Sequence, residues 1–304
     1  MRVANAMISH SAIKRIGEAT SKSFRLQEQI SSGKRILRPS DEPAGAVHAS
    51  ALRTALAELQ QYVKNAAGAK SLLGMTDSAL GDITNLLRSA RASGLAGAND
   101  TSDSATRAAL AQSVNQILQA VTGDANSDAA GQFLFAGFKT TTSPFTLNAA
   151  ATPPVTYNGD SGVIGFEVSR TSTVLVNLAG DQVFNMAGAA DPAIADVFST
   201  LANLRDALNS GNSAQMQNCV TELDKHLSRI VSLRADLGSR IQVIDLISNR
   251  LGANELSIKG TLSDTEDIDI SQALIDLQSQ QNVYQATVSI TAMMSQKGLV
   301  DYLR

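Results

Sequence analysis

The 304-residue sequence has few aromatic residues, no tryptophan and a single cysteine. Aromatic residues make up 4% of the chain, which suits long, thin helices better than a thick globular core. With Cys219 alone, no intrachain disulfide can form, and we expect this residue to be a small buried apolar group in a helix. The sequence also lacks a run of 18 apolar residues and an apolar N-terminal segment, so we predict neither a transmembrane helix nor a cleaved secretory signal.

Signatures of catalysis and of metal binding are missing as well. His10, His48 and His226 lie far apart and share no ligand spacing, so we interpret them as surface or core groups. The chain contains no phosphate-binding loop of the GxxxxGK[ST] type and no HExxH motif. The acidic run 264–269 lacks the glycine and the spaced ligands of a calcium loop, and we assign it to the start of the last helix. We therefore predict a protein that is not an enzyme and that has no cofactor and no metal site.

Charge is distributed unevenly along the chain. The net charge of −3 argues against general binding to nucleic acid or to membranes. Residues 1–40 carry eight basic and two acidic groups, whereas residues 264–304 carry six acidic and two basic groups. Such ends can attract each other within a subunit or between subunits, although two solvated faces that merely differ remain the alternative. Lys34, Arg35 and Arg38 could contact phosphate, but we favour a solvated joint or a subunit contact.

Helical periodicity dominates the first 121 residues. A weak apolar stripe runs from Val3 to Ile30, and a stronger helix is predicted from about Asp41 to Ser93. Its apolar positions between residues 52 and 80 follow a heptad with Lys70 and Asp77 as polar interruptions, which favours coiled-coil packing. A break at residues 99–102 precedes a third helix over residues 103–121.

The C-terminal part is again helical. Asp191 and Pro192 form a helix-start signal, and that helix is expected to end near residue 211. A long helix follows from about Ser213 to Leu262, residues 263–266 break the pattern, and the last helix begins near Asp267. The last helix carries a heptad seam that can pair with other helices but is too polar to be stable alone: Ile270, Leu274, Leu277, Gln281, Tyr284, Val288 and Thr291.

The central part has a different pattern. Residues 131–137 read as a strand or a buried turn between two glycines, and residues 155–157 and 163–168 are predicted to form a hairpin around Asn158-Gly159. A further strand is expected over residues 173–178. Four of the eight phenylalanines lie between Phe133 and Phe145, which indicates a small aromatic core in this region. We therefore predict a mainly α protein with a small β-rich inserted domain, divided into residues 1–130, 131–189 and 190–304.

The stretch at residues 29–46, QISSGKRILRPSDEPAGA, reads as a helix–loop–helix joint. The first helix is expected to end near Gly33, and Pro39 biases Arg38 away from helical conformation. Ser40 and Asp41 are suitable N-caps for the next helix, and Pro43 is tolerated in its first turn.

The same stretch resembles the N-terminal signature of the flagellin superfamily. The residues that carry the resemblance are Gln29, Ser31, Gly33, Lys34, Arg35 and residues 39–46, in which Glu42 replaces the more usual aspartate. Residues 65–80 and the C-terminal segment around residues 278–286 resemble the same superfamily. Residues 131–137 and the ending Asp301-Tyr302-Leu303 resemble the branch that forms the hook–filament junction.

This resemblance implies a fold and a role. Both ends of the chain would pair as a long antiparallel helical bundle or coiled coil, with the β-rich insertion displayed outside. The protein would be a structural adaptor between the flagellar hook and the flagellin filament, required for motility. Its partners would be further copies of itself in a ring or helical layer, the hook-side junction protein, flagellin, the export apparatus and a chaperone at the C-terminal helix. It would be secreted to the bacterial flagellum through the flagellar type III pathway without a cleaved signal peptide.

The motifs also suggest where assembly contacts lie and how they form. The residues expected at assembly interfaces are Ile13, Ile16, Leu26, Gln29, Ile30, Gly33, Pro39, Ser40, Asp41, Pro43, Ala46, Asn65, Leu274, Leu277, Gln281, Tyr284, Val288 and Leu299. Because the terminal helices are weakly apolar, we expect them to order only when neighbouring subunits complete the coiled coil. Two alternatives stay open, namely a small flagellin that builds the filament itself and a coiled-coil scaffold outside the flagellum.

Overall fold

The computed structural model describes residues 2–99, 102–148, 153–186 and 189–300, without the side chains of residues 2–6, 8, 9 and 294–300. It is mainly helical, as predicted, and it divides into two compact units. The first unit comprises Met1–Glu58 with Asn254–Arg304, and the second comprises Leu59–Ala253. Residues 131 and 190, where we predict domain boundaries, both lie inside the second unit. The predicted division into three parts stays a prediction.

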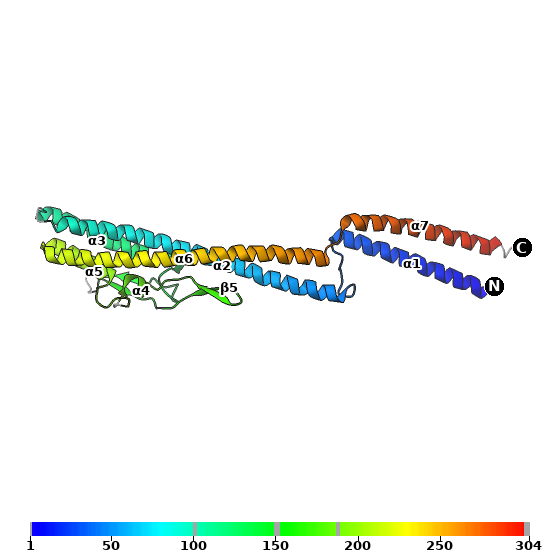
Figure 1. The fold of residues 1–304 in the computed structure, drawn as a ribbon, viewed down its shortest axis with the longest axis horizontal. Helices are drawn as coiled ribbons and strands as arrows, with labels where there is room; N and C mark the ends of the chain where they lie inside the picture. The colour runs from blue at the N-terminus through cyan, green and yellow to red at the C-terminus, as the bar shows by residue number, and fades with distance from the viewer. Residues whose placement is uncertain (1, 100–101, 149–152, 187–188, 301–304) are drawn as a thin grey trace. The chain divides into compact units, whose positions relative to one another are not determined.

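The first unit contains an antiparallel helix pair. Helix α1 (Arg2–Ser32) and helix α7 (Ile270–Val300) lie side by side, and the start of α1 is at the same end of this pair as the end of α7 (Figure 1). Helix α1 ends where predicted, because Gly33 adopts a φ of 72° that favours glycine. The predicted break at residues 263–266 is wrong by three residues. Helix α6 continues to Glu266, and α7 begins after Asp269, whose carboxylate accepts hydrogen bonds from the amides of Ser271 and Gln272.

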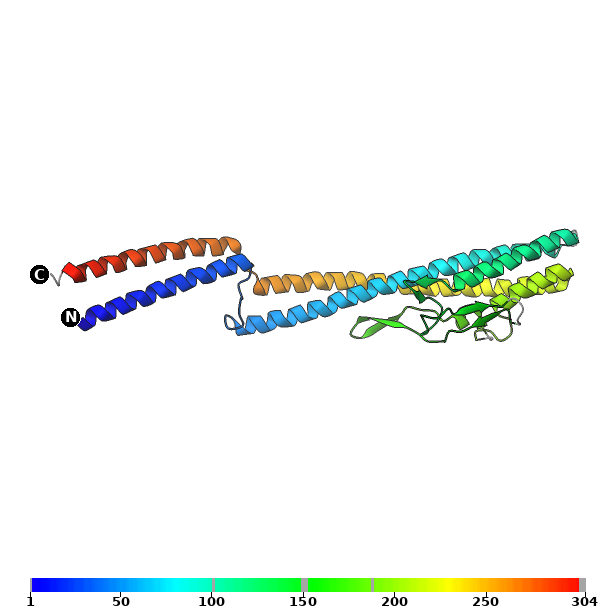
Figure 2. The ribbon, with the colours of Figure 1, turned by 180° about the vertical axis from the view of Figure 1, so that it is seen from behind.

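The second unit contains most of the two longest helices. Helices α2 (Pro43–Gly97) and α6 (Ser213–Glu266) lie along each other in both views of the ribbon (Figure 2). Their buried residues recur in steps of three and four, the spacing of a coiled-coil seam. On α2 these residues are Ala66, Ala69, Leu73, Thr76, Leu80, Ile83, Leu87 and Ala90. On α6 they are Met216, Cys219, Leu223, His226, Ile230, Leu237, Ile244, Ile247 and Leu251.

The polar interruptions predicted for the α2 seam lie outside it. The structure places Ala69 and Thr76 in the seam, whereas Lys70 and Asp77 flank it and pair with α6. Lys70 Nζ lies 2.6 Å from Asp245 Oδ1 and Arg234 Nε lies 2.7 Å from Asp77 Oδ1. Arg91 and Asp224 form a third ion pair between the two helices, at 2.5 Å. The seam therefore has no charged residue at these positions. The flanking ion pairs hold α2 and α6 in antiparallel register.

Helix α3 (Ser104–Ala125) packs on helix α5 (Val197–Ser210) in the second unit. Asp103 caps α3 by accepting a hydrogen bond from the Thr106 amide at 2.8 Å. The predicted start of α5 at Asp191 is wrong, because the Asp191 carboxylate accepts from the Ala193 amide in a local turn. Asp196 is the N-cap instead, and its carboxylate accepts from the Ser199 amide at 2.8 Å.

Within its described residues, the β-rich region forms three two-stranded antiparallel sheets. They pair β1 (Asp128–Ala129) with β2 (Gln132–Phe133), β3 (Phe145–Leu147) with β4 (Val155–Tyr157), and β5 (Gly165–Ser169) with β6 (Ser172–Leu175). The predicted hairpin around Asn158-Gly159 is therefore wrong. Asn158 instead binds back towards β3, since its amide donates to Pro144 O and its side chain donates to Thr146 Oγ1.

An aromatic cluster forms the core of this region, as predicted from the phenylalanine content. Phe145 lies at its centre, with ring centroids 5.1 Å from Tyr157, 5.0 Å from Phe184 and 5.3 Å from Phe198. Phe184 belongs to the short helix α4 (Gly180–Phe184) and Phe198 belongs to α5. The cluster thus joins the strands to a helix of the bundle.

Candidate functional site

Two breaks in the helical pattern, some 230 residues apart in sequence, meet in the first unit. The amide of Arg35 donates to Glu266 O at 2.7 Å, and the amide of Ile268 donates to Gly33 O at 3.0 Å. These bonds form a one-residue antiparallel bridge between Lys34 and Asp267. We call residues 33–42 together with residues 265–268 the joint. Because helix α1 ends at Ser32 and helix α6 ends at Glu266, the bridge satisfies polar groups that these helix ends leave free.

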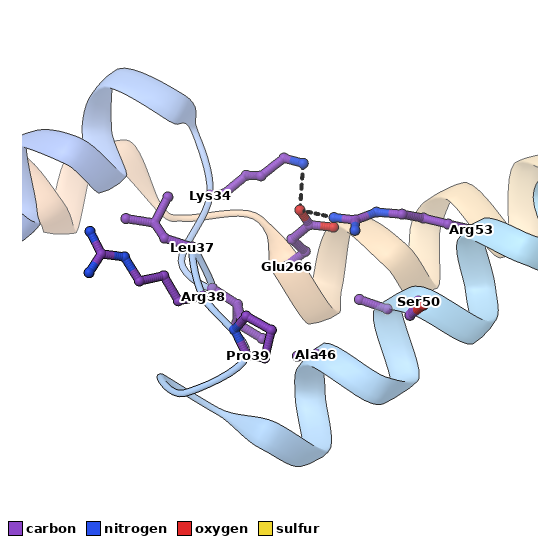
Figure 3. A pocket seen from close by; sticks show the side chains of 10 residues that line it. Lys34, Leu37, Arg38, Pro39, Ala46, Ser50, Arg53 and Glu266 are labelled. Atoms are coloured by element: carbon purple, nitrogen blue, oxygen red, sulfur yellow. Dashed lines mark hydrogen bonds and ion pairs between the residues drawn. The ribbon is translucent and has the colours of Figure 1, made fainter.

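A buried carboxylate connects both sides of the joint. The Glu266 side chain is 4% exposed, and its Oε1 lies 2.5 Å from Lys34 Nζ and also accepts from Arg53 of α2 (Figure 3). Burial alone would raise the pKa of Glu266, but the hydrogen bonds from Lys34 and Arg53 lower it below its usual value. The ion pairs therefore add stability at neutral pH, and this contribution is lost as pH falls through the lowered pKa.

A hollow of about 430 Å³ opens beside Glu266. Its apolar lining comes from Ile36, Leu37, Pro39, Ala46 and Ala49, so two predicted interface residues, Pro39 and Ala46, border it (Figure 3). Ile36 is buried against Gly45, where an added Cβ would lie 2.7 Å from the Ile36 side chain. The glycine is thus needed for the close approach of the loop to the first turn of α2.

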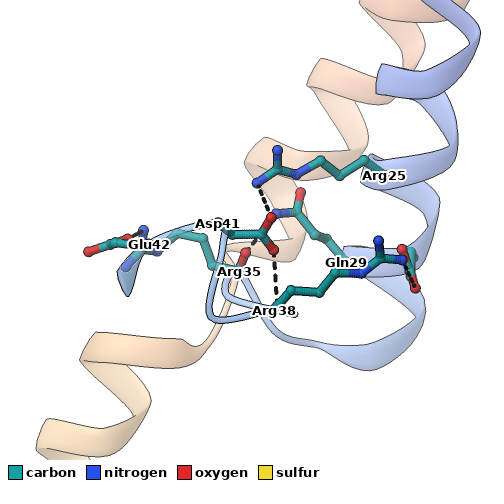
Figure 4. A network of polar contacts seen from close by, with 7 residues as sticks. Arg25, Gln29, Arg35, Arg38, Asp41 and Glu42 are labelled. Atoms are coloured by element: carbon teal, nitrogen blue, oxygen red, sulfur yellow. Dashed lines mark hydrogen bonds and ion pairs between the residues drawn. The ribbon is translucent and has the colours of Figure 1, made fainter. Parts of the chain in front are cut away.

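A second polar network shapes the loop itself (Figure 4). The Asp41 carboxylate accepts from the Arg38 amide at 3.1 Å and lies 3.1 Å from Arg25 of α1. Arg35 pairs with Glu42 and donates to Thr265 O at 2.8 Å. The Gln29 side chain donates to Arg35 O at 2.7 Å.

This arrangement corrects the predicted N-cap of α2. Helix α2 begins at Pro43, and Glu42 O accepts the first helical hydrogen bond, from the Ala46 amide at 2.9 Å. Asp41 is engaged with the loop and with α1, while Ser40 is exposed. Pro43 has no amide hydrogen that would need a cap, which allows the helix to begin two residues after Asp41.

The structure brings part of the predicted interface set together. Gln29, Gly33, Pro39, Asp41, Pro43 and Ala46 lie at or beside the joint, and Ile16, Leu26 and Ile30 are half-buried on α1. Ile13 is exposed. Asn65 lies in the second unit, where its side chain donates to Glu167 O at 2.8 Å. Glu266 and Arg53 are absent from the predicted set, because no local motif marks a contact across so many residues.

The predicted seam of α7 divides into two sets. Leu277 and Thr291 are half-buried, and Tyr284 lines a hollow of about 150 Å³ together with Gln281 and α1 residues. Leu274 and Val288 are 51% and 40% exposed, so α1 covers only one side of the stripe. The side chain of Leu299 and residues 301–303 lie outside the described residues.

Comparison with known proteins identifies a known region in the N-terminal part of the chain. Residues 3–140, which include the α1–α2 side of the joint, match the bacterial flagellin N-terminal helical region. Similarity to flagellar proteins also extends over nearly the whole chain. The flagellar hook-associated protein 3 of Salmonella typhimurium is 26% identical over 94% of this chain and 95% of the relative. A flagellin of Bacillus subtilis is 24% identical over 98% of this chain and 97% of the relative.

A similar fold is present in a solved structure. The hook-associated protein 3 of Legionella pneumophila superposes with a TM-score of 0.63, covering 71% of this chain and 98% of that one at 17% identity. This likeness concerns the fold alone. Among the described residues, the structure holds no helix long and apolar enough to span a membrane.

Proposed function

We propose that this protein is a structural adaptor that joins the flagellar hook, through the hook-side junction protein, to the flagellin filament. The observation that carries the proposal is the similarity to a hook-associated protein 3 over nearly the full length of both chains. A flagellin matches over a similar share, so the small-flagellin alternative is tested below. We further propose export through the flagellar type III pathway without a cleaved signal, with a chaperone at α7, as the superfamily resemblance implies.

The α1–α7 pair supports a mechanism in which folding is coupled to assembly. Among the described side chains of these helices, the buried apolar ones are Ala19 and Ala273. Burying an alanine methyl contributes less than about 1 kcal/mol, whereas ordering a residue costs roughly 1–2 kcal/mol. Neighbouring subunits that cover the exposed apolar residues of α7 would supply the missing burial. We therefore propose that the two helices become stable in the assembled layer.

Hydrogen exchange in the free monomer tests this mechanism. We expect amides of residues 1–35 and 270–304 to exchange within roughly tenfold of the rate of an unstructured chain, because their opening costs little. The seam of α2 and α6 in the second unit should be protected far more strongly, since it buries many leucine and isoleucine side chains. The measurement requires a sample verified as monomeric by light scattering. Strong protection of both terminal segments would contradict coupled folding.

Deletion of the gene tests the adaptor function. We expect cells with bare hooks and abundant flagellin shed into the medium, because subunits that cannot attach are lost after export. Electron microscopy and an immunoblot of the medium are the readouts, and the gene restored on a plasmid is the control. Bare hooks without any flagellin in the culture would show that this chain is itself the filament protein. Normal filaments would contradict both flagellar functions.

A further inference from the structure

One histidine lies in an unusual place in the second unit. His226 occupies a position of the α6 seam that is otherwise apolar, and it is fully buried at 0% exposure. Neither of its ring nitrogens makes a hydrogen bond of good geometry, although the backbone of Ala195 lies close enough to act on the ring. Buried polar side chains in folded proteins almost always have a partner, so an orphaned imidazole calls for an explanation.

Charged groups surround this imidazole on all the elements that pack near it. Arg229 lies almost one turn further along α6, with its Nε buried and unpartnered, and its guanidinium donates to Gln182 O of α4. Asp191 and Asp196, from the chain that leads into α5, act electrostatically on His226. Asp181 of α4 acts on Arg229. Glu222, one turn earlier on α6, accepts a hydrogen bond from Thr200 of α5 at 3.0 Å.

The chain between α4 and α5 is organised as one piece around Asn185. This residue is fully buried and adopts a φ of 57°. Its side-chain oxygen accepts from the amides of Ala190 and Asp191 at 3.0 and 2.7 Å. Its side-chain nitrogen donates to Asp191 O and Ile194 O at 2.8 and 3.1 Å. We call Asn185, Met186 and residues 189–196 the latch segment. Because the hydrogen bonds of the Asn185 side chain are internal to the segment, they can persist when the segment leaves α6.

We propose that His226 is a proton-sensitive latch: the neutral imidazole keeps the latch segment seated on α6, and the imidazolium releases it. A neutral ring tolerates an apolar seam, whereas a charged ring beside Arg229 must reach water. This requires the latch segment to move, since the closed site leaves the ring no exposure.

The direction of the pH effect follows from burial. Burial lowers the pKa of His226 from 6.5 to about 4, and Arg229 acts in the same direction, while the Ala195 backbone and the carboxylates of Asp196 and Asp191 oppose it. The released form then binds the proton more tightly than the seated form. The contribution of the neutral imidazole to holding the latch segment on α6 is therefore complete above pH 6.5, and it is lost as pH falls towards 4. Between pH 7.5 and pH 5 the equilibrium constant for release should rise about 30-fold by proton linkage.

Hydrogen exchange of the full chain at pH 7.5 and pH 5, corrected for the intrinsic pH dependence of exchange, tests the latch. We expect amides of α4 and the latch segment to lose about 30-fold in protection, while seam amides of α2 change far less. His226→Leu should remove most of this pH dependence, because the leucine cannot bind a proton. His48→Gln, which changes an exposed histidine, should keep it. Equal pH dependence in the wild type and in His226→Leu would overturn the proposal.

An NMR titration of the wild type keeps the proposal testable if His226→Leu fails to fold. The Cε1 proton of each of the three histidines is followed from pH 8 to pH 4. We expect the signal of His226 to shift only in acid, well below its ordinary pKa of 6.5, together with amides of the latch segment. A His226 signal that shifts near pH 6.5, with the latch segment still seated, would overturn the proposal.

Discussion

Glu266→Lys is expected to open the joint and to abolish swimming. The substitution places a third cation beside Lys34 and Arg53, at a side chain that is 4% exposed. A buried charge without a counterion costs about 3–5 kcal/mol, and two half-exposed neighbours place this site near the lower value. The expected local result is fast exchange of the Ile268 amide, which donates a bridge hydrogen bond to Gly33 O. The expected cellular result is a gene that fails to restore motility in the deletion strain.

Matched variants separate this effect from a general change of charge. Asp264→Lys makes the same charge change two residues away at an exposed position. We expect it to have little effect on amide exchange at the joint or on motility. Glu266→Gln keeps the shape and one acceptor, and should cost about 1–2 kcal/mol. Combining Glu266→Lys with Arg53→Glu reverses the pair and should restore part of the protection. If Glu266→Lys behaves like Asp264→Lys, the buried carboxylate does not hold the joint.

The sequence predicted features that depend on neighbouring residues. Gly33 ends α1 because a positive φ needs glycine, and Pro39 and Pro43 bound the loop through local stereochemistry. The long helices follow from periodicity, which is a property of each segment alone. The residues that resemble the flagellin signature lie in these same local features. The sequence therefore predicts the position of the joint, although not its long-range contacts.

Features that depend on distant residues were missed. The α2 seam passes through Ala69 and Thr76, whose weak apolar character gives less signal than nearby leucines, so Lys70 and Asp77 were wrongly placed in it. The strong turn signal of Asn158-Gly159 was overridden by the tertiary contacts of β4. Tyr157, for example, packs on Phe145 and donates its hydroxyl to Phe135 O at 2.9 Å.

The exposed half of the α7 stripe leads to the second prediction. Leu274 and Val288 are 51% and 40% exposed and lie on the same side of the helix, two heptads apart. In the free chain, replacing both by aspartate should change stability by no more than about 0.5 kcal/mol per site, as at other exposed positions. In an assembled layer where a neighbouring helix covers them, each carboxylate would be buried without a partner. That burial costs several kcal/mol per site, so assembly should fail while folding and export continue.

The double variant Leu274→Asp with Val288→Asp is therefore expected to reproduce the deletion phenotype with normal amounts of the protein in the medium. Ser279→Asp is the control, because it adds a carboxylate like each single substitution, but at an exposed position on the opposite side of α7. Secreted amount, circular dichroism of the purified monomer and filament count by electron microscopy are measured for both. Loss of filaments in the double variant alone would assign the exposed stripe to a subunit contact.

Normal filaments in both would mean that this side of α7 faces solvent in the assembled flagellum. In that case the burial that stabilises α1 and α7 would have to come from other residues of the pair, such as Ile13 and Phe24 of α1, which are both 66% exposed.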